Sequence, residues 1–271
     1  MHIFNSHVHT NNSKDSNVSM DEMCLAACAQ NLSGLAITDH CEISAFISDN
    51  SYQKTKASVM LAAKLKEKYA GKLHVGVGTE IGDGILNPEY TARILRLADF
   101  DVVLASVHVV KYQDKIMHLS RVDFSKLSQE VISEYMKEYF DALLETAEKS
   151  DFDVLSHLTI PLRYTNAECG MNVNIMDYAP MIDRILKAII KRDKSIEVNT
   201  SEINRIGLMP DKNILVRYRE LGGKKVTIGS DAHNTSNLTL GIDEAIETLK
   251  ACGFTQYGYY EKRRYIGVNI D

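Results

Sequence analysis

The sequence predicts an α/β fold in which seven βα units close into a barrel, with the active site at the carboxyl ends of the parallel strands. Short apolar runs alternate with amphipathic helical patterns along the whole chain, and such alternation implies parallel strands joined by helical crossovers. Seven or eight such units usually close into a barrel; an open doubly wound sheet is the alternative. The 271 residues are 45% hydrophobic and contain no linker-like segment, so we expect one domain over residues 1–271.

Local patterns place each element. Apolar runs of strand length occur at residues 2–5, 34–38, 73–79, 102–106, 154–156, 196–199 and 225–229, with a candidate extra strand at 265–268. Helical patterns begin near residue 19 and recur at residues 52–69, 88–97, 126–149, 176–192, 212–221 and 242–251. Ser19 and Glu22 have the spacing of a capping box, and Pro88 suits the first position of a helix.

Composition argues against several classes of partner. The net charge of -5 gives no indication of a general affinity for nucleic acid. No apolar run reaches the roughly 18 residues of a membrane span, and the amino terminus lacks the pattern of a signal peptide. The five cysteines form no CxxC pair, which favours a reducing cytoplasm as the location. We therefore expect neither nucleic acid nor a membrane as a partner, and the oligomeric state stays open.

Metal-ligating residue types gather at the ends of the predicted strands. Six of the nine histidines fall at these positions, together with carboxylates and one amide. In chain order, the residues are His7 and His9; Asp39 and His40; Glu80; His108; His157; Asn199; and Asp231 and His233. Because the carboxyl ends of parallel strands meet at one mouth of a barrel, we expect these side chains to converge there.

Each of these residues has a structural explanation when it is taken alone. His7 and His9 are two positions apart and would face the same way on a strand, but a lone HxH pair is also common on protein surfaces. Glu80 and Asp231 are each compatible with a salt bridge, and His157 with a buried core position. Their coincidence at one face indicates instead a site for Zn, Mn or Fe ions, in which carboxylates can bridge two ions.

The order of these motifs resembles that of the polymerase and histidinol phosphatase (PHP) family. The matching elements are HVHT at 7–10, TDH at 38–40, GTE at 78–80, SVH at 106–108, SH at 156–157 and SDAH at 230–233. They extend over essentially the whole chain. The resemblance implies a distorted (β/α)7 barrel that holds two or three divalent metals.

The resemblance also implies how the ligands are shared. The three implied ligand sets are His7, His9, Glu80 and Asp231; Glu80, His108 and His157; and Asp15, His40 and His233. Glu80 would thus bridge the first two metals. Asp15 stands where relatives often carry His, which makes the third site harder and favours Mn or Fe over Zn. A turn carboxylate in a polar loop is the other interpretation of Asp15.

The charge of this cluster points to a phosphomonoester substrate. Three divalent ions and the carboxylates of Asp15, Glu80 and Asp231 leave a charge of about +3, which a phosphate dianion and an attacking hydroxide would balance. In the implied mechanism, a hydroxide that bridges two ions attacks phosphorus, while ions and arginines neutralise the equatorial oxygens. Asp231 and His233 are the candidates for protonating the leaving group.

Four residues are candidate contacts of the substrate phosphate. Arg163 follows the fifth predicted strand and Arg205 the sixth, and guanidinium groups bind phosphate in a bidentate manner. Surface salt bridges are the alternative for both. Lys111 is a weaker candidate, and Asn199 either contacts the substrate or caps a loop. Residues 109–124 are long for a βα connection and form a candidate lid.

The compact length resembles the stand-alone branch of the family. That branch hydrolyses L-histidinol phosphate to L-histidinol and phosphate in histidine biosynthesis, so this small-molecule reaction is the expected one. Glu42 and Asp114, in loops expected at the mouth, are candidates to meet a cationic amine of that substrate. The alternatives are the same chemistry on phosphotyrosine or nucleotides, and a non-catalytic metal-binding module.

Overall fold

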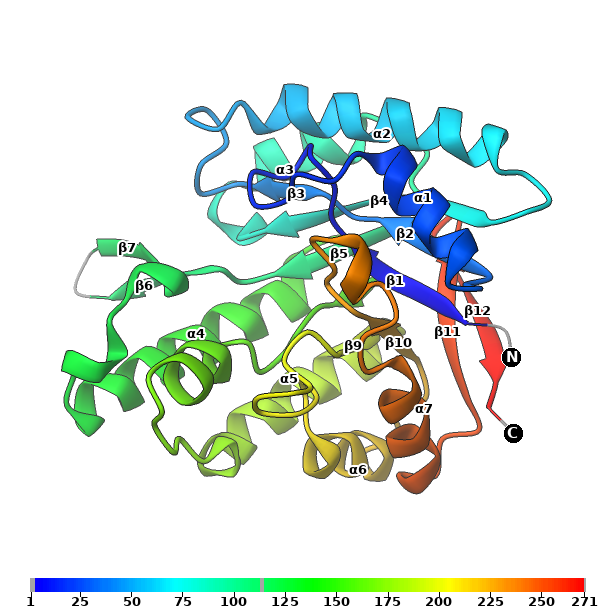
Figure 1. Ribbon diagram of the computed structural model, residues 1–271. Coiled ribbons are helices and arrows are strands. Elements are labelled where there is room, and N and C mark those ends of the chain that lie inside the picture. Colours follow the sequence, from blue (N-terminus) through cyan, green and yellow to red (C-terminus); the bar gives the residue numbers. More distant parts are fainter. Residues whose placement is uncertain (1–2, 113–114, 271) are drawn as a thin grey trace.

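The strands form one extended sheet in the computed structural model, which describes residues 3–112 and 115–270 (Figure 1). The ten strands of this sheet follow the order β1-β2-β4-β5-β8-β9-β10-β11-β12, with β3 paired to β4. Their bounds are β1 (Phe4–Val8), β2 (Gly34–Ile37), β3 (His40–Glu42), β4 (His74–Gly82), β5 (Val102–Ser106), β8 (Val154–Leu155), β9 (Ser195–Asn199), β10 (Val226–Gly229), β11 (Gln256–Glu261) and β12 (Arg264–Asn269). All pairings up to β11 are parallel, and β12 runs antiparallel to β11.

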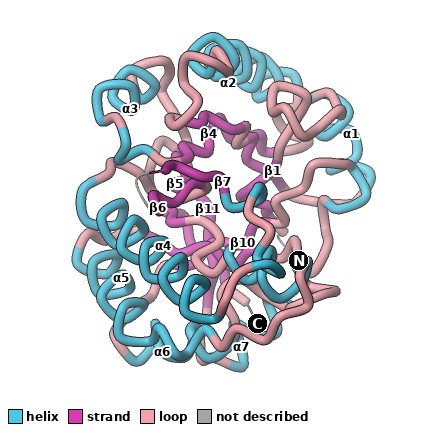
Figure 2. Tube along the Cα trace, turned by 90° about the vertical axis from the view of Figure 1, so that its left-hand side faces the viewer, coloured by secondary structure: helices cyan, strands magenta, loops and turns pink. Residues whose placement is uncertain are grey.

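Helices connect the parallel strands and surround them on the outside (Figure 2). Their bounds are α1 (Met20–Ala29), α2 (Ser51–Lys68), α3 (Pro88–Leu95), α4 (Gln129–Lys149), α5 (Ala179–Lys191), α6 (Lys212–Glu220) and α7 (Ile242–Ala251). The capping box predicted for the first helix is confirmed, because Ser19 and Glu22 each accept a hydrogen bond from the main-chain N–H of the other. Pro88 is the first residue of α3, as predicted. The chain therefore has the predicted mixed α/β fold.

The carboxyl ends of β1 and β10 approach each other. Val8 of β1 forms a parallel bridge with Ala232, which follows β10, and the N–H of His9 donates to the carbonyl of Ala232 at 2.9 Å. Within the described residues β1 and β10 share this bridge rather than a continuous ladder, so strand pairing does not close the sheet into a ring. At the other end of β1, the N–H of Phe4 donates to the hydroxyl of Tyr257 on β11 at 3.2 Å.

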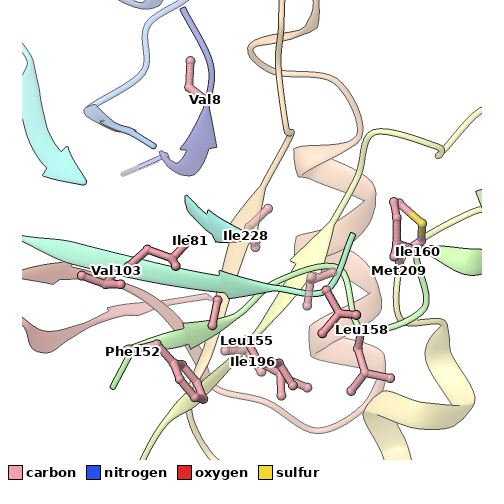
Figure 3. Close-up of a cluster of buried hydrophobic side chains, with 14 of the residues drawn as sticks. Val8, Ile81, Val103, Phe152, Leu155, Leu158, Ile160, Ile196, Met209 and Ile228 are labelled. Atoms are coloured by element: carbon pink, nitrogen blue, oxygen red, sulfur yellow. The ribbon is translucent and has the colours of Figure 1, made fainter. Parts of the chain in front are cut away.

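Apolar side chains from successive parallel strands meet in the core (Figure 3). Val103, Leu155, Ile196 and Ile228 come from β5, β8, β9 and β10, and all four are fully buried. Burial of such side chains contributes roughly 1.5–3 kcal/mol each to folding. Because this core holds the parallel strands in place, the loops that follow their carboxyl ends begin at fixed positions.

Several predicted boundaries were wrong. The first strand is Phe4–Val8 rather than residues 2–5, because its polar residues are buried and bonded inside the fold: Asn5, for example, donates to the hydroxyl of Ser230 at 2.6 Å. The third predicted strand continues to Gly82, so Glu80 lies within β4 rather than at its end. Strands β3 and β11 were not predicted, whereas the candidate extra strand at 265–268 is confirmed as part of β12.

The segment predicted as a long loop after the fourth strand contains a two-stranded hairpin. Its strands are β6 (Val109–Tyr112) and β7 (Lys115–His118), which pair antiparallel apart from the main sheet. Two short 3-10 turns then lead to α4. In the part of the chain that the structure describes, no helix combines the length and apolar character that a membrane span requires.

Candidate metal centre

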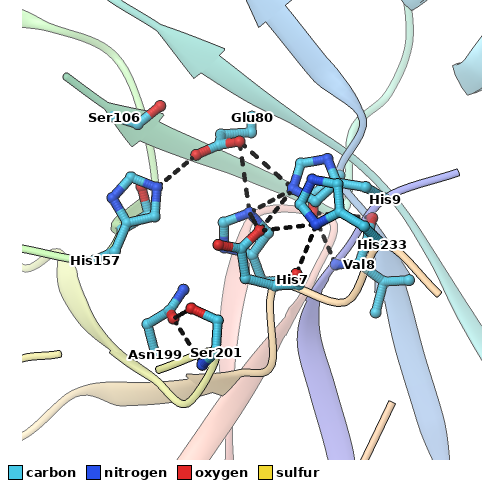
Figure 4. Close-up of polar contacts among 12 residues, drawn as sticks. His7, Val8, His9, Glu80, Ser106, His157, Asn199, Ser201 and His233 are labelled. Carbon is cyan, nitrogen blue, oxygen red and sulfur yellow. Dashed lines mark hydrogen bonds and ion pairs between the residues drawn. The ribbon is translucent and has the colours of Figure 1, made fainter. Parts of the chain in front are cut away.

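The nine predicted metal ligands converge at the carboxyl ends of the parallel strands. Figure 4 labels five of them, His7, His9, Glu80, His157 and His233. They come from β1, β3 and β4 and from the segments that follow β1, β5, β8 and β10. Most are buried, although polar, because each faces the others rather than solvent. Asp231 adopts a left-handed backbone conformation with φ of 52°, which Asp tolerates better than most residues and which re-aims the chain directly after β10.

The first predicted ligand set lies around the end of β1. The Nε2 atoms of His7 and His9 are 2.9 Å apart, and both face the same oxygen of Glu80, Oε2, at 3.5 and 3.6 Å. Oδ1 of Asp231 lies 3.6 Å from Nε2 of His7 and 3.1 Å from Nε2 of His9. Four donor atoms thus surround one small volume.

The second predicted set shares Glu80 with the first. Its other oxygen, Oε1, lies 2.9 Å from Nε2 of His157 and 3.4 Å from Nε2 of His108. The two Nε2 atoms of His108 and His157 are 3.5 Å apart. The two oxygens of one buried carboxylate therefore face two different groups of imidazoles, which is the arrangement of a bridging ligand.

The third predicted set lies nearer the surface. Oδ2 of Asp15 is 3.3 Å from Nε2 of His40 and 3.4 Å from Nε2 of His233. The sets also merge, because His9, His40 and His233 offer nitrogens within 4.8 Å of one another, as do the ligand atoms of His40, Glu80 and His108. The side chain of Asp15 is 46% exposed, the most accessible of this third set.

Unsatisfied buried atoms show that this cluster fits metal ions. Oε2 of Glu80 and Nδ1 of His40 are buried and 2.7 Å apart, but they approach without hydrogen-bond geometry. Adjacent ligands of a tetrahedral zinc ion with Zn–N distances near 2.1 Å would be about 3.4 Å apart. The measured separations of 2.9 to 3.6 Å between facing donors match such an arrangement. Imidazole and carboxylate donors of this kind suit divalent Zn, Mn or Fe.

Two buried carboxylates orient the histidines from behind. Oε1 of Glu197 lies 2.7 Å from Nδ1 of His7, and Oε1 of Glu42 lies 2.8 Å from Nδ1 of His108. An Nδ1–H that donates to a carboxylate leaves Nε2 free as a metal ligand and fixes the plane of the ring. Neither orienting role was predicted, although the spacing of Glu197 from Asn199 placed it on the same face of the sixth strand. Glu42 was predicted to meet a substrate amine; it lines the cavity, but this oxygen faces His108. Asp114, the other such candidate, lies outside the described residues.

Asp39 lies behind the predicted metal ligands and acts on one of them through Ser13. It accepts hydrogen bonds from the hydroxyl of Ser13 at 2.9 Å and from the main-chain N–H of Thr10 at 2.6 Å. With its hydrogen directed at Asp39, the Ser13 oxygen is left to accept from Nδ1 of His9, 3.2 Å away. The relay through Ser13 orients His9 in the same way that Glu197 orients His7.

The cluster has strongly perturbed protonation equilibria without metal. Burial lowers the pKa of His7, but the carboxylates of Glu197, Asp231 and Glu80 outweigh this and raise the pKa well above its ordinary value. Burial raises the pKa of Glu80, and the surrounding histidines, led by His40, more than reverse this, so its pKa is well below the usual range. Burial and the charge of His40 lower the pKa of His9 to about 3. The cluster thus holds charges that only tight pairing, or bound cations, can stabilise.

A cavity of about 290 Å³ opens over the outer side of this cluster. Arg163 lines it, with Nη2 3.2 Å from Oδ2 of Asp231 and 2.7 Å from the Ser201 hydroxyl. Nε of Arg163 lies 2.9 Å from Oε1 of Glu202, a carboxylate that was not predicted as part of the site. Three oxygens of different residues thereby hold one guanidinium beside the predicted metal ligands.

Further cationic and aromatic side chains line the rest of the cavity. These side chains are Lys14, His118, Arg121 and Tyr164. His118 reaches the cavity from the end of β7, and burial together with the charge of His108 lowers its pKa to about 4. The hairpin thus contributes to one wall of the site.

The other three candidate phosphate contacts do not line this cavity in the part of the chain that the structure describes. The side chain of Arg205 is 46% exposed, and its Nη1 lies 3.2 Å from Glu202. Asn199 is buried beneath the site, where its amide donates to Glu197 at 3.2 Å and its oxygen accepts from Ser201. Lys111 is on the exposed side of β6. The side chain of Asn199 therefore caps the loop that follows β9, which is one of its two predicted alternatives.

Comparison with known proteins agrees with this geometry. The family model of the PHP domain matches residues 5–201. A protein of Clostridium acetobutylicum named probable histidinol-phosphatase is 30% identical over 275 residues, which cover 96% of this chain and 98% of that protein. A protein of Thermotoga maritima with the same name is 33% identical over 138 residues, covering 51% of this chain and 56% of the relative.

A solved structure shares the fold. The crystal structure of histidinol phosphate phosphatase from Lactococcus lactis, complexed with zinc, L-histidinol and phosphate, aligns with a TM-score of 0.79 at 20% sequence identity, and the alignment covers 97% of this chain and 98% of that one. From the matched family model and the full-length relative, the chain belongs to the PHP domain family.

Proposed function

We propose that this protein is a metal-dependent phosphomonoesterase that hydrolyses L-histidinol phosphate to L-histidinol and phosphate. The observation that carries the proposal is Glu80, whose two oxygens face two separate groups of histidines in a buried cluster. Three relatives in addition to the Lactococcus protein are named probable histidinol-phosphatase, and one of them matches over nearly the full length of both chains.

The metals of this proposal are two or three divalent ions. The three ligand sets centre on Glu80 with His7, on Glu80 with His157, and on Asp15 with His40. Divalent ions in such sites lower the pKa of water toward about 7 and neutralise the charge of a phosphate group. The identity of the ions is proposed to be Zn, Mn or Fe, with the carboxylate of Asp15 favouring the harder metals in the outer site.

The remaining roles fall to side chains that face the cavity. Arg163 is proposed to donate to phosphate oxygens, since its guanidinium is fixed beside Asp231 and remains on the cavity wall. Asp231 and His233 are proposed to exchange the proton of the leaving group, because both line the same cavity. The small volume, about 290 Å³, favours a compact ester over a large substrate.

We further propose that the sheet is a distorted (β/α)7 barrel within one domain. Seven strands from β1 to β10 pair in parallel in chain order, apart from the short β3 beside β4. The bridge between Val8 and Ala232 brings the two ends of this series together at the carboxyl side. A barrel accounts for the convergence of predicted ligands from β1 and β4, and from the segments after β5, β8 and β10, at one mouth.

The test is phosphate release from a panel of esters by protein loaded with Mn, Zn or Fe, with and without a chelator. The panel contains histidinol phosphate, a phosphotyrosine peptide, nucleotides and single-stranded DNA. Chelator-sensitive turnover of histidinol phosphate, well above that of the other esters, is expected. Preference for another ester would replace the substrate and keep the chemistry. Absence of turnover with metal bound would favour a non-catalytic module.

A further inference from the structure

A second cavity lies at the opposite end of the strands from the metal centre. Its volume is about 390 Å³, and its lining includes Asp153, Lys194 and Lys225. Each of these residues stands immediately before a parallel strand, β8, β9 or β10, whose far end leads to the metal cluster. A strand of five residues such as β9 spans roughly 16 Å, so this cavity is separate from the proposed active site.

The lining of this cavity is basic, in contrast to the net charge of -5 of the chain. The charged residues that line it are Arg192, Lys194, Lys225, Arg263 and Arg264, against the two carboxylates Asp153 and Asp193. Asp151 adds a third carboxylate through its contact with Arg263 at 2.8 Å. The positive charges still exceed the negative ones after Asp151 is counted.

Two of the basic residues have close carboxylate partners. Nζ of Lys225 lies 2.6 Å from Asp193, and Nε of Arg263 lies 2.9 Å from Asp153. We attribute these two ion pairs to the stabilisation of this end of the sheet. Arg192 is different, because its guanidinium donates at 2.7 Å to two main-chain carbonyls at the end of α4. Its orientation is fixed by neutral groups, and no carboxylate within hydrogen-bond distance offsets its charge among the described residues.

Lys194 and Arg264 are also left without close carboxylates. Nζ of Lys194 is 4.0 Å from Oδ1 of Asp153, beyond hydrogen-bond distance, and both oxygens of that carboxylate face Arg263. The side chain of Lys194 is only 21% exposed, so a desolvated ammonium faces the cavity. Arg264 is exposed at the rim, and no ion pair involves it within residues 3–112 and 115–270.

We propose that this cavity binds a small phosphate-bearing anion between Arg192, Lys194 and Arg264. Guanidinium and ammonium groups are the side chains that bind phosphate, and a guanidinium already oriented by carbonyls loses little entropy on binding. A phosphate group fills only part of about 390 Å³, and Tyr265 and Tyr260 line the remainder. The ligand class is therefore a phosphate ester of a small metabolite, whose organic part lies against the tyrosines.

The experiment is isothermal titration of chelator-treated protein with inorganic phosphate and, separately, with AMP as an ester probe. Removal of metals prevents turnover and weakens binding at the other end of the molecule. The variant Lys194→Met removes the partly buried ammonium, and Lys187→Met on the exposed face of α5 is the matched control. Loss of one charged hydrogen bond is expected to weaken binding about tenfold in Lys194→Met and not in Lys187→Met.

The two probes distinguish the sources of the phosphate group. Tighter binding of AMP than of phosphate supports an ester ligand, whereas equal binding supports a site for the free ion and overturns the ester class. If Lys194→Met fails to fold, Arg264→Gln, a substitution at an exposed position, should weaken binding in the same direction. Unchanged affinity in these variants, or no binding to the native chain, would overturn the site itself.

Discussion

Oε1 of Glu197 lies 2.7 Å from Nδ1 of His7, while Oε2 of the same carboxylate accepts the main-chain N–H of His157 at 2.8 Å. One fully buried side chain thus holds a ligand of the first proposed metal and the backbone of a ligand of the second. The absence of a side chain at Gly229 makes room for it, because a Cβ there would lie 2.1 Å from Oε1 of Glu197. Glu197 is therefore a positioning residue for both metal sites.

Glu197→Gln should lower metal affinity without loss of the fold. Gln offers one acceptor oxygen where the two oxygens of Glu197 accept from His7, His157 and Asn199, so either His7 or His157 would face an amide N–H₂. Loss of such an orienting partner typically costs about 10–100-fold in metal affinity. Metal titration of the apoprotein, followed by elemental analysis, measures the change. Glu220→Gln is the matched control, because Glu220 is 60% exposed and contacts only Arg217 among the ion pairs found. Equal affinity in the two variants would remove the positioning role.

Glu80→Ala should abolish turnover and lower the number of tightly bound metals. The residue faces both of the inner ligand groups, so its removal takes a ligand from two metals at once. The expected loss of activity exceeds 100-fold, since removal of an orienting partner alone can cost that much. Metal content by mass spectrometry and phosphate release are measured on the same preparation. Normal metal content with normal turnover would contradict the bridging assignment.

Arg163→Ala and Arg205→Ala should differ, although the sequence predicted similar roles. Arg163 lines the cavity and is held beside Asp231, so its loss is expected to raise KM about 10-fold or more. Arg205 does not line the cavity, and its exposed side chain forms an ion pair with Glu202. Its loss should therefore change KM by less than about threefold. Steady-state kinetics of both variants decide this. Equal increases in KM would return Arg205 to the phosphate site.

The convergence of the predicted metal ligands was predictable because their positions follow from strand ends. His108 and His157 each come directly after buried apolar runs, and parallel strands bring such positions to one mouth. The orienting carboxylates were harder to recognise, because Glu42 and Glu197 are buried acids whose partners are distant in sequence. Only the packed structure shows that the charge of each is opposed by a histidine.

The remaining differences from the sequence-based predictions have similar causes. The first strand was placed too early because Asn5 and His7 are polar, and polar residues in a run normally indicate its end. Here they are buried and bonded to partners more than 180 residues away, Ser230 and Glu197. Arg205 was predicted to contact the phosphate because it follows a strand, but in the structure its guanidinium forms an ion pair with Glu202, three residues earlier. Tertiary partners decided each of these positions.

Binding of metal to the apoprotein should release protons at neutral pH. Burial lowers the pKa of His40, but the carboxylates of Glu80, Asp15 and Glu42 outweigh this and raise it to about 10, so the metal-free imidazole is protonated at pH 7. A histidine must be neutral to bind a metal, so binding expels this proton, and affinity should rise as the pH rises toward that pKa. His9, with a pKa of about 3, is already neutral and contributes none. Titration calorimetry in PIPES and in Tris, which differ in ionisation enthalpy, gives the number of protons released. The pKa values of His7 and His108 are raised as well, by the carboxylates around them, so these ligands add to the protons released. Identical heats in the two buffers would show that all three histidines are neutral before the metal binds, and would require different charge pairing around Glu80.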